Sequence, residues 1–305
     1  MGRWDDALTE IGIVPEHLKE SFAACCELAI AAVISFHRDE ADTARSHLAA
    51  AQAYGQRLGH RTVPALSLAE SLDHEEAGRL NDALAVLVMA FDSDANNMGE
   101  TEDLLADAVR LALKTGDEAT ARRLAERAAA LADDSDIPHQ QANSLYCRGM
   151  VEQDAFTLLA AAPRYADAGR PLPRAKALEA AARCLAEAHD QIRARQAYEE
   201  AAEVYEFLRA EADVKRTSGE FRAYGIRRGP HSKHRRAASG WNSLTKSEIQ
   251  VAALVEEGLS NPEIAARLML SRRTVATYVS HILKKLNVTT RTDIARESAL
   301  RAISS

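Results

Sequence analysis

The sequence predicts an all-α protein in two parts: an α-solenoid of helix pairs over residues 1–225 and a four-helix domain over residues 241–305. The first part repeats with a period of 36 to 39 residues, and the second carries closely spaced helix-capping signals. Charge also divides the chain. Residues 1–225 contain 24 Lys and Arg against 39 Asp and Glu, whereas residues 226–305 contain 14 against 6. A basic C-terminal part therefore follows an acidic body, and we expect the acidic part to avoid nucleic acid.

Each repeat is marked by a turn-forming residue, followed five positions later by a small or apolar residue inside a helix. The six pairs are Gly2 with Ala7, Asp39 with Ala44, Gly78 with Ala83, Gly116 with Ala121, Gln153 with Leu158, and His189 with Ala194. Two helical segments fit between successive marks, for example 117–132 and 138–153. Such a helix pair cannot bury its apolar face alone and stacks on its neighbours. We expect the small residues where two helices cross closely.

This pattern resembles the tetratricopeptide repeat, a helix pair that stacks into a superhelix. By that resemblance, residues 2–7 (GRWDDA) match the start of a second helix, yet no first helix precedes them. Two explanations are open: the chain is the C-terminal piece of a longer protein, or the orphan helix caps the stack. We expect the concave side of such a stack to bind an effector, either a protein or a small molecule.

Residues 226–240 form the expected linker between the two parts. They combine Arg and Lys with Gly, Pro and Ser, which favours a flexible tether that adds contacts to phosphates. His231 and His234 have the spacing of a metal-binding pair. Histidines in a basic loop are more often solvated, so we expect no metal there.

Three helix starts are marked in the C-terminal domain. Thr245 is followed three residues later by Glu248, and Ser260 by Glu263, which gives two capping boxes that satisfy free amides at a helix N-terminus. After a short turn, Ser271 opens a third helix. Close spacing of capped helices predicts a compact helix-turn-helix arrangement.

The third helix has one apolar face and one polar, basic face. The apolar stripe is Val275, Val279, Ile282 and Leu286, which we expect to pack on Ile249, Leu254, Ile264 and Leu268. The opposite side carries Arg272, Arg273, Ala276, Thr277, Ser280, His281 and Lys284. Small side chains for base edges and cations for phosphates are what a helix in the DNA major groove requires. The alternative is a solvated charged surface, but the three caps and the short turn favour DNA binding.

Residues 244–295 resemble the LuxR-type DNA-binding domain of bacterial transcription regulators. The resemblance rests on Leu244, Thr245, Glu248, Val251, Gly258, Leu259, Ser260, Asn261, Ile264, Ala265, Leu268, Ser271, Thr274, Val275, Ile282, Lys285, Leu286, Val288 and Arg291. It implies that Ala276, Thr277 and Ser280 face bases, and that Thr274, Lys284, Lys285 and Arg291 lie near the DNA backbone. From their places on the helix we add His281 to the base-reading set, and Ser271, Arg272 and Arg273 to the backbone set.

The sequence departs from that family at two positions of the third helix. The family often has Lys where this chain has Ala276, and His where it has Tyr278, so the first departure removes a base or phosphate contact. The fourth helix, about 291–302, is where the resemblance implies dimer contact on DNA. Its residues Ile294, Ala295, Ala299 and Leu300 fit the domain core equally well.

No motif for catalysis or for a cofactor stands out. The segment 194–241 resembles the C-terminal half of large ATP-binding LuxR-type regulators, which place an NTPase domain before their helical repeats. This chain has no phosphate-binding G-x-x-x-x-G-K-[ST] motif, so we expect no ATP hydrolysis, no enzymatic activity and no cofactor.

The four cysteines and the apolar segments point to a cytoplasmic protein. Cys25, Cys26, Cys147 and Cys184 lack zinc-ligand spacing and are typical of thiols buried in a reducing cytosol, although the adjacent Cys25 and Cys26 leave a redox role open. There is no signal peptide pattern, and the longest apolar stretch, 28–36, is too short to cross a membrane.

These observations predict a transcription regulator. The helical repeats receive a signal, and the C-terminal domain binds double-stranded promoter DNA as a homodimer, without membrane contact. The alternative is an interaction scaffold in which the solenoid carries the main activity and DNA binding is accessory. Promoter footprinting separates the two, because a scaffold need not prefer any DNA sequence.

Overall fold

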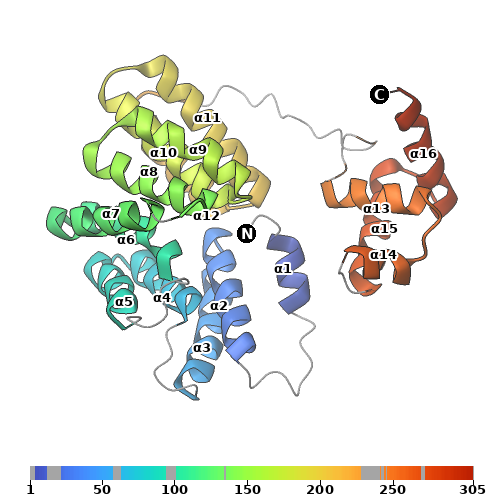
Figure 1. Cartoon of the computed structure of the whole chain (residues 1–305), viewed down its shortest axis with the longest axis horizontal. Helices are drawn as coiled ribbons and strands as arrows, with labels where there is room; N and C mark the ends of the chain where they lie inside the picture. The colour runs from blue at the N-terminus through green and yellow to red at the C-terminus, as the bar shows by residue number, and fades with distance from the viewer. Residues whose placement is uncertain are drawn as a thin grey trace. The chain divides into compact units, whose positions relative to one another are not determined.

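The computed structural model describes residues 4–11, 22–57, 63–93, 101–133, 135–227, 241, 244, 246–268 and 272–304. Within these ranges every regular element is a helix, which confirms the all-α prediction. The chain divides into two compact units, Met1–Arg228 and Gly229–Ser305, which are described separately below (Figure 1). We call them the helical unit and the C-terminal unit.

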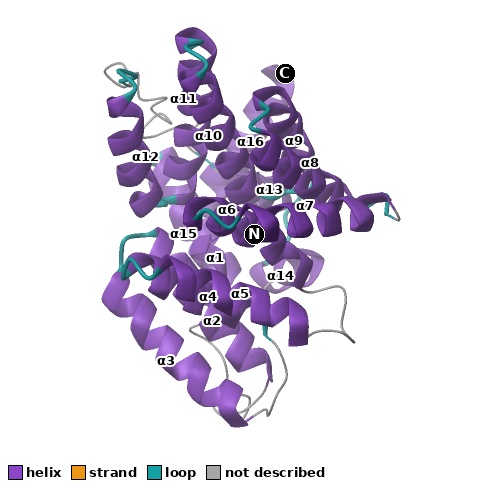
Figure 2. Ribbon diagram, turned by 90° about the vertical axis from the view of Figure 1, so that its left-hand side faces the viewer, coloured by secondary structure: helices purple, strands orange, loops and turns teal. Residues whose placement is uncertain are grey.

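The helical unit is a stack of antiparallel helix pairs (Figure 2). The pairs are α2 (Phe22–His37) with α3 (Ala41–Arg57), α4 (Pro64–Glu76) with α5 (Leu80–Ser93), α6 (Leu105–Thr115) with α7 (Glu118–Asp133), α8 (Pro138–Glu152) with α9 (Ala155–Asp167), and α10 (Pro171–Glu187) with α11 (Gln191–Leu208). A single helix, α1 (Trp4–Ile11), precedes the first pair, and α12 (Glu211–Ala223) follows the last. A short 3-10 helix, η2 (Thr101–Leu104), leads into α6.

The residues that mark the repeat in the sequence lie at the tight turns between the two helices of each pair. Their φ angles are +65° at Asp39, +75° at Gly78, +80° at Gly116, +53° at Gln153 and +61° at His189. This left-handed conformation ends an α-helix because it redirects the chain while the last carbonyls still receive hydrogen bonds. The turn predicted at Gly2 lies outside the described residues.

The residues five positions after these turns are fully buried, as the repeat pattern predicts. Ala44, Ala83, Ala121, Leu158 and Ala194 all have 0% exposure. An alanine at this place lets the second helix of a pair approach its neighbours closely. In α1 the corresponding Ala7 is partly buried.

Leu158 departs from the alanine rule, and Gly149 on the partner helix accounts for it. A Cβ atom at Gly149 would lie 2.8 Å from Cγ of Leu158 and 3.0 Å from its backbone nitrogen. The small residue has thus moved from α9 to α8, and the larger side chain fills the space across the same crossing.

Charged side chains from the first helices of several pairs form a polar core in the helical unit. Asp107 on α6 accepts a hydrogen bond from Lys176 on α10 at 2.7 Å. Arg110 on α6 donates to Glu75 on α4 at 2.6 Å. Further along, the buried Glu179 of α10 accepts bonds from two helices, including one from Arg216 of α12 at 2.6 Å. These paired charges connect helices α4, α6, α10 and α12 of the unit.

The C-terminal unit contains α13 (Lys246–Glu256), α14 (Asn261–Leu268), α15 (Arg272–Leu286) and α16 (Arg291–Ser304). Its core consists of Leu244, Val251, Ala252, Leu254, Val255, Ile264, Ala265, Val275, Tyr278, Ile282 and Ile294. Trp241 packs against the edge of this core, so the unit is already ordered at that residue.

Two details of this core differ from the sequence expectation. Ile249 is 39% exposed, because α13 buries the face that contains Val251, Ala252 and Val255, and Ile249 lies outside that stripe. On α15, Tyr278 is buried at 7% exposure, whereas Val279 and Leu286 are only partly buried. The inward stripe of α15 is therefore Val275, Tyr278 and Ile282.

Helix caps fix the turns of the C-terminal unit. The backbone N–H of Ser260 donates to the Glu263 carboxylate at 2.7 Å, as the predicted capping box requires. Thr290 and Asp293 form a further box at the start of α16, in which the Asp293 N–H donates to the Thr290 hydroxyl at 3.2 Å. This further box was not predicted from the sequence. The box at Thr245 lies outside the described residues.

Candidate nucleic-acid interface

The outward face of α15 carries polar and cationic side chains and no carboxylate. The exposed residues are Arg272, Ala276, Thr277, Ser280, His281 and Lys284. They recur at the spacing of a single helical face, opposite the buried Val275, Tyr278 and Ile282. Because Val275 and Ile282 are fully buried, rotation of α15 about its axis is fixed and this face must point to solvent.

Ser280 already uses its hydroxyl proton within the helix. The Ser280 Oγ donates to the carbonyl of Ala276, one turn earlier, at 3.0 Å. The two lone pairs of the hydroxyl oxygen remain directed outward, so Ser280 can accept a hydrogen bond from a base amino group without losing the bond to Ala276.

Lys285 differs from its neighbour Lys284 in its environment. Its ammonium group donates to both carboxylate oxygens of Glu248 on α13, at 2.8 Å and 2.7 Å. The Glu248 side chain is 3% exposed, while that of Lys285 is 32% exposed. Lys285 thus neutralises a buried carboxylate and ties α15 to α13. Lys284 is exposed one position earlier on the helix.

Arg291 likewise has partners inside the unit. Its guanidinium donates to the side-chain oxygen of Asn261 at 2.7 Å and to the backbone carbonyl of Leu259. These bonds connect the start of α16 to the turn between α13 and α14. Both Lys285 and Arg291, which we placed near the DNA backbone from the resemblance, therefore hold the elements that surround α15.

The remaining positions of the proposed backbone set lie at the start of α15. Ser271 lies outside the described residues, as does the turn at residues 269–270. Arg273 and Thr274 belong to the first turn of α15, and their side chains are outside the described part of the chain. Arg272 is exposed at the same end of the helix.

On α16 the structure assigns one residue to the core. Ile294 is fully buried, and Ala295 packs against the same core from its edge. The side chains of Ala299 and Leu300 lie outside the described residues. The first turn of α16 thus serves the core of the unit, and the dimer interpretation of its later residues stays a prediction.

Two cysteines of the helical unit, Cys25 and Cys147, are buried in surroundings that keep their thiols protonated. Cys25 is fully buried and its thiol donates to the carbonyl of Ala51 at 3.4 Å. Burial raises the pKa of the Cys25 thiol, and burial raises that of Cys147 to about 12. A protonated thiol is a poor nucleophile, so both residues behave as small apolar side chains.

The described residues contain no group of three or more metal-ligating side chains, and none of their helices is both long and apolar enough to cross a membrane. His231 and His234 lie outside the described residues.

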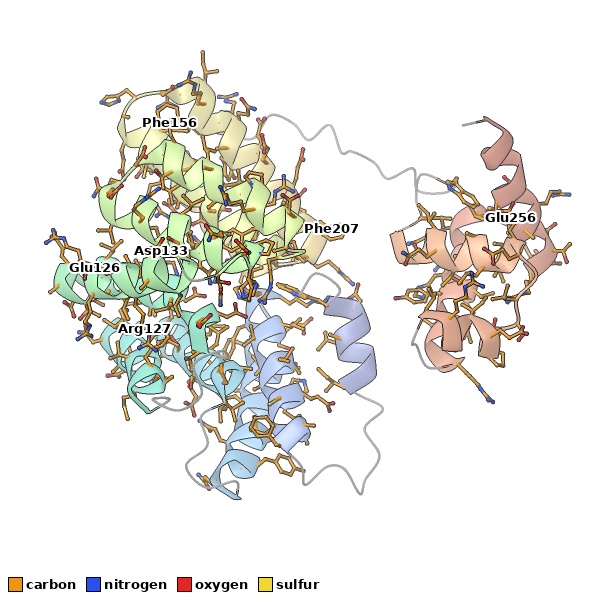
Figure 3. The ribbon with its side chains drawn as sticks, in the orientation of Figure 1. Glu126, Arg127, Asp133, Phe156, Phe207 and Glu256 are labelled. Atoms are coloured by element: carbon orange, nitrogen blue, oxygen red, sulfur yellow. The ribbon has the colours of Figure 1, made fainter. Side chains whose placement is uncertain are left out.

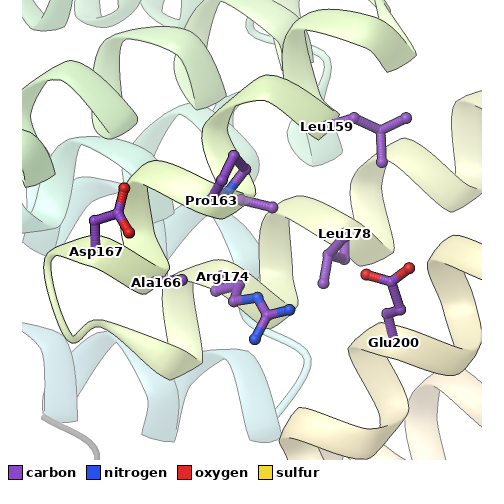
Figure 4. A pocket seen from close by; sticks show the side chains of 8 residues that line it. Leu159, Pro163, Ala166, Asp167, Arg174, Leu178 and Glu200 are labelled. Carbon is purple, nitrogen blue, oxygen red and sulfur yellow. The ribbon is translucent and has the colours of Figure 1, made fainter.

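Surface features of the helical unit that suit an effector are small and separate. Phe156 is 64% exposed and Phe207 is 55% exposed, and Figure 3 shows them at different edges of the unit. A shallow groove of about 340 Å³ lies between α9, α10 and α11, where Arg174 and Glu200 flank the buried Leu178 (Figure 4). These features leave the identity of an effector open.

Four short helices, with a carboxylate-free polar face on the third, define a helix-turn-helix DNA-binding domain. Comparison with known proteins supports this class. Residues 242–298 match the family described as bacterial regulatory proteins, luxR family. The C-terminal unit is a LuxR-family helix-turn-helix domain.

Relatives with this domain are named as transcription regulators. Over 69 residues the chain is 46% identical to an HTH-type transcriptional regulator of Mycobacterium tuberculosis, a match that covers 23% of this chain and 8% of that protein. Over 54 residues it is 43% identical to the DNA-binding transcriptional activator DevR/DosR of the same organism, covering 18% of this chain and 25% of that protein. A match of 43% over 53 residues to the transcriptional regulatory protein LiaR of Bacillus subtilis covers 17% and 25%.

The chain spans less than a tenth of the length of the first of these relatives. No solved structure matches the chain.

Proposed function

We propose that this chain regulates transcription by reading promoter DNA through the outward face of α15. The observation that carries the proposal is the composition of that face: six exposed positions with two permanent cations, small polar groups and no acid. On a helix that enters the major groove, cations of such a face contact phosphates and its polar side chains contact base edges. The absence of carboxylates leaves the positive charge of this face uncompensated.

Within this face, Ala276, Thr277, Ser280 and His281 meet base edges. Arg272 and Lys284 meet phosphates, together with Ser271, Arg273 and Thr274 at the entry of the helix. Lys285 and Arg291 hold α15 and α16 in place and add positive potential beside the DNA backbone. Ala276 meets the methyl group of a thymine or a base edge without a hydrogen bond, so sequence preference there is weak.

The charge of the whole chain supports this division of labour. Residues 226–305 carry a net charge of +8 and residues 1–225 a net charge of −15. The acidic helical unit is repelled by DNA and remains available to an effector, while two C-terminal units occupy paired half-sites as a homodimer.

Selection of bound sequences from a random duplex library by the full chain tests the proposal. The result expected is an enriched, two-fold symmetric motif with half-sites about 10 bp apart. Binding without any enriched motif would contradict promoter reading and favour the scaffold alternative, in which DNA contact is accessory.

A further inference from the structure

The first and last repeats of the helical unit meet at a seam of charged residues. Helix α2 packs against α12, although their residues are separated by more than four helix pairs in sequence. At the centre of the seam, Nδ1 of His37 lies 2.6 Å from Oδ2 of Asp213, and these side chains are 7% and 8% exposed. Lys215 and Asp39 form an ion pair at its edge. The stack therefore closes on itself.

Helix α1 lies across this seam and contacts both of its sides. One carboxylate oxygen of Asp5 is 2.6 Å from Nη2 of Arg38, which follows α2, and 3.7 Å from Nη1 of Arg209, which follows α11. The Trp4 ring packs on the His37 ring at a centroid distance of 5.7 Å. Trp4 is 5% exposed and shares an apolar cluster with Ile34 of α2 and Tyr205 of α11. Figure 1 shows α1 beside α2.

The forces at the seam differ from those between consecutive repeats. Consecutive pairs are joined by the fully buried apolar residues of the repeat and by ion pairs such as Arg110–Glu75, and chain connectivity also holds them together. Across the seam, side chains are joined by the His37–Asp213 hydrogen bond, by the exposed Lys215–Asp39 ion pair and by the apolar cluster that Trp4 of α1 completes. An exposed ion pair contributes little net free energy. In addition, Nε of Arg38 is buried without a hydrogen-bond partner, a cost that opening removes.

Helix α1 is also too short to persist by itself. It contains eight residues, and isolated helices of this length are unstable in water because nucleation is unfavourable. Its helical structure therefore depends on docking at the seam. Docking and folding of α1 form a single step, which makes α1 either bound and ordered or released.

We propose that α1 is a strap that closes the helical unit by bridging its first and last repeats. Release of α1 opens the seam between α2 and α12 and exposes the charged faces of both helices to solvent. Because α12 is followed by the linker to the C-terminal unit, opening moves the attachment point of the DNA-binding domain. The strap does not depend on the DNA-binding assignment.

The strap is tested by comparing backbone amide hydrogen exchange in the full chain with and without the substitution Asp5→Asn. The substitution removes the carboxylate that Arg38 and Arg209 share. Backbone amide exchange should therefore accelerate about three- to fivefold, which is the effect of losing one exposed ion pair. The acceleration should be equal in α1 and in the part of α12 that lies at the seam. Asp82→Asn is the matched control, because Asp82 of α5 is similarly exposed and pairs with Arg79, the residue that precedes α5. It should leave α1 and α12 unchanged. Acceleration in α1 without acceleration in α12 would mean that α1 merely frays, and the strap proposal fails.

A second experiment closes the seam artificially. Asp39→Cys with Lys215→Cys in the Asp5→Asn chain allows the two sides to be joined with a short bis-maleimide. Joining should return the exchange of α1 and α12 to that of the parent chain, because the docking site of Trp4 is restored. The same reagent on Asp5→Asn without the new cysteines is the control. If α1 exchanges as fast after joining as before, the seam and the strap are not coupled and the proposal is wrong.

Fluorescence reports the strap independently. The chain contains two tryptophans, Trp4 and Trp241, so Trp241→Phe leaves Trp4 as the sole indole. Asp5→Asn in that background should shift the emission to longer wavelength and increase quenching by acrylamide. Unchanged emission and quenching, together with accelerated exchange, would place the opening elsewhere than at Trp4.

Discussion

Lys284 and Lys285 are adjacent lysines in the sequence, yet their side chains have different environments and different roles. A helix turns by about 100° per residue, so one lysine points to solvent while the other reaches Glu248 on α13. The same contrast holds for Arg291, whose guanidinium binds the turn after α13. A positive charge near a DNA-binding helix is thus not by itself a phosphate contact.

Lys285→Ala should destabilise the C-terminal unit. The change leaves the Glu248 carboxylate buried without its cation, at a cost of about 2 kcal/mol after allowance for the partial exposure of the lysine. Urea unfolding of the chain measures this, with Lys284→Ala as the control, which should unfold like the parent. Equal stability of both variants would show that the Glu248 pair contributes nothing.

The contact between Gly149 and Leu158 leads to a second prediction. Gly149→Ala should cost about 1–3 kcal/mol, because the new Cβ overlaps the Leu158 side chain. Leu158→Ala alone should also destabilise the unit, by leaving a cavity. The double variant restores the alanine found at the equivalent place of the other repeats, so it should be more stable than the sum of the single effects predicts. Additive losses in a double-mutant cycle would refute the compensation.

At the scale of elements, what the sequence could predict follows from its periodic signals. The turn residues of the repeat were predictable because few residue types adopt a positive φ without steric strain. The buried residue five positions later was predictable because close helix crossings need small side chains. The outward face of α15 was predictable from apolar spacing. Tyr278 was not assigned to the core, since its ring and hydroxyl fit a polar helix face equally well.

The seam was not predictable for a different reason. His37 and Asp213 are 176 positions apart, and a contact between them leaves no periodic trace in one sequence. The ion pair between Asp107 and Lys176 was not predictable for the same reason. In the sequence alone, each residue is indistinguishable from a solvated surface residue. Sequence patterns report local structure, whereas closure of the stack arises from the accumulated superhelical rotation of its pairs.

The polar core of the helical unit predicts a specific loss of stability in acid. Burial of Asp107 opposes its ionisation, but Lys176 and Arg110 outweigh this and lower its pKa from 3.8 to about 2. A carboxyl group whose pKa is lower in the folded state than in the unfolded state stabilises the fold at pH values above the unfolded-state pKa. This stabilisation is lost as the pH falls through the folded-state pKa. Stability should therefore decline between about pH 4 and pH 2, by about 2 kcal/mol from this group.

Unfolding by urea at several pH values checks this, with Asp107→Asn as the comparison. The side chain of the variant cannot ionise, so its stability should change less over the same interval. The variant is less stable at neutral pH, because Lys176 loses its partner and Arg110 loses one of its two carboxylates. Parallel curves for the two proteins would show that Asp107 is not a source of the acid sensitivity.

At the scale of the whole molecule, two units of opposite charge share one chain. The acidic stack of helix pairs and the basic LuxR-family domain differ in the sign of their net charge, which governs non-specific association with DNA. The proposed function assigns sequence recognition to the C-terminal unit and signal reception to the helical unit. Within α15, the proposal is that Ala276, Thr277, Ser280 and His281 read base sequence and that Lys284 and Lys285 do not.

Equilibrium binding of three variants to a selected and a scrambled duplex, over a series of salt concentrations, tests that claim most directly. Ser280→Ala should change the preference between the two duplexes by roughly 1 kcal/mol, the scale of one base contact. Lys284→Ala should weaken binding to both alike and reduce the slope of log K against log salt by about one. Val275→Asp, at a fully buried position, should abolish folding of the domain and all binding. A change of preference in Lys284→Ala, with preference intact in Ser280→Ala, would contradict the assignment of α15.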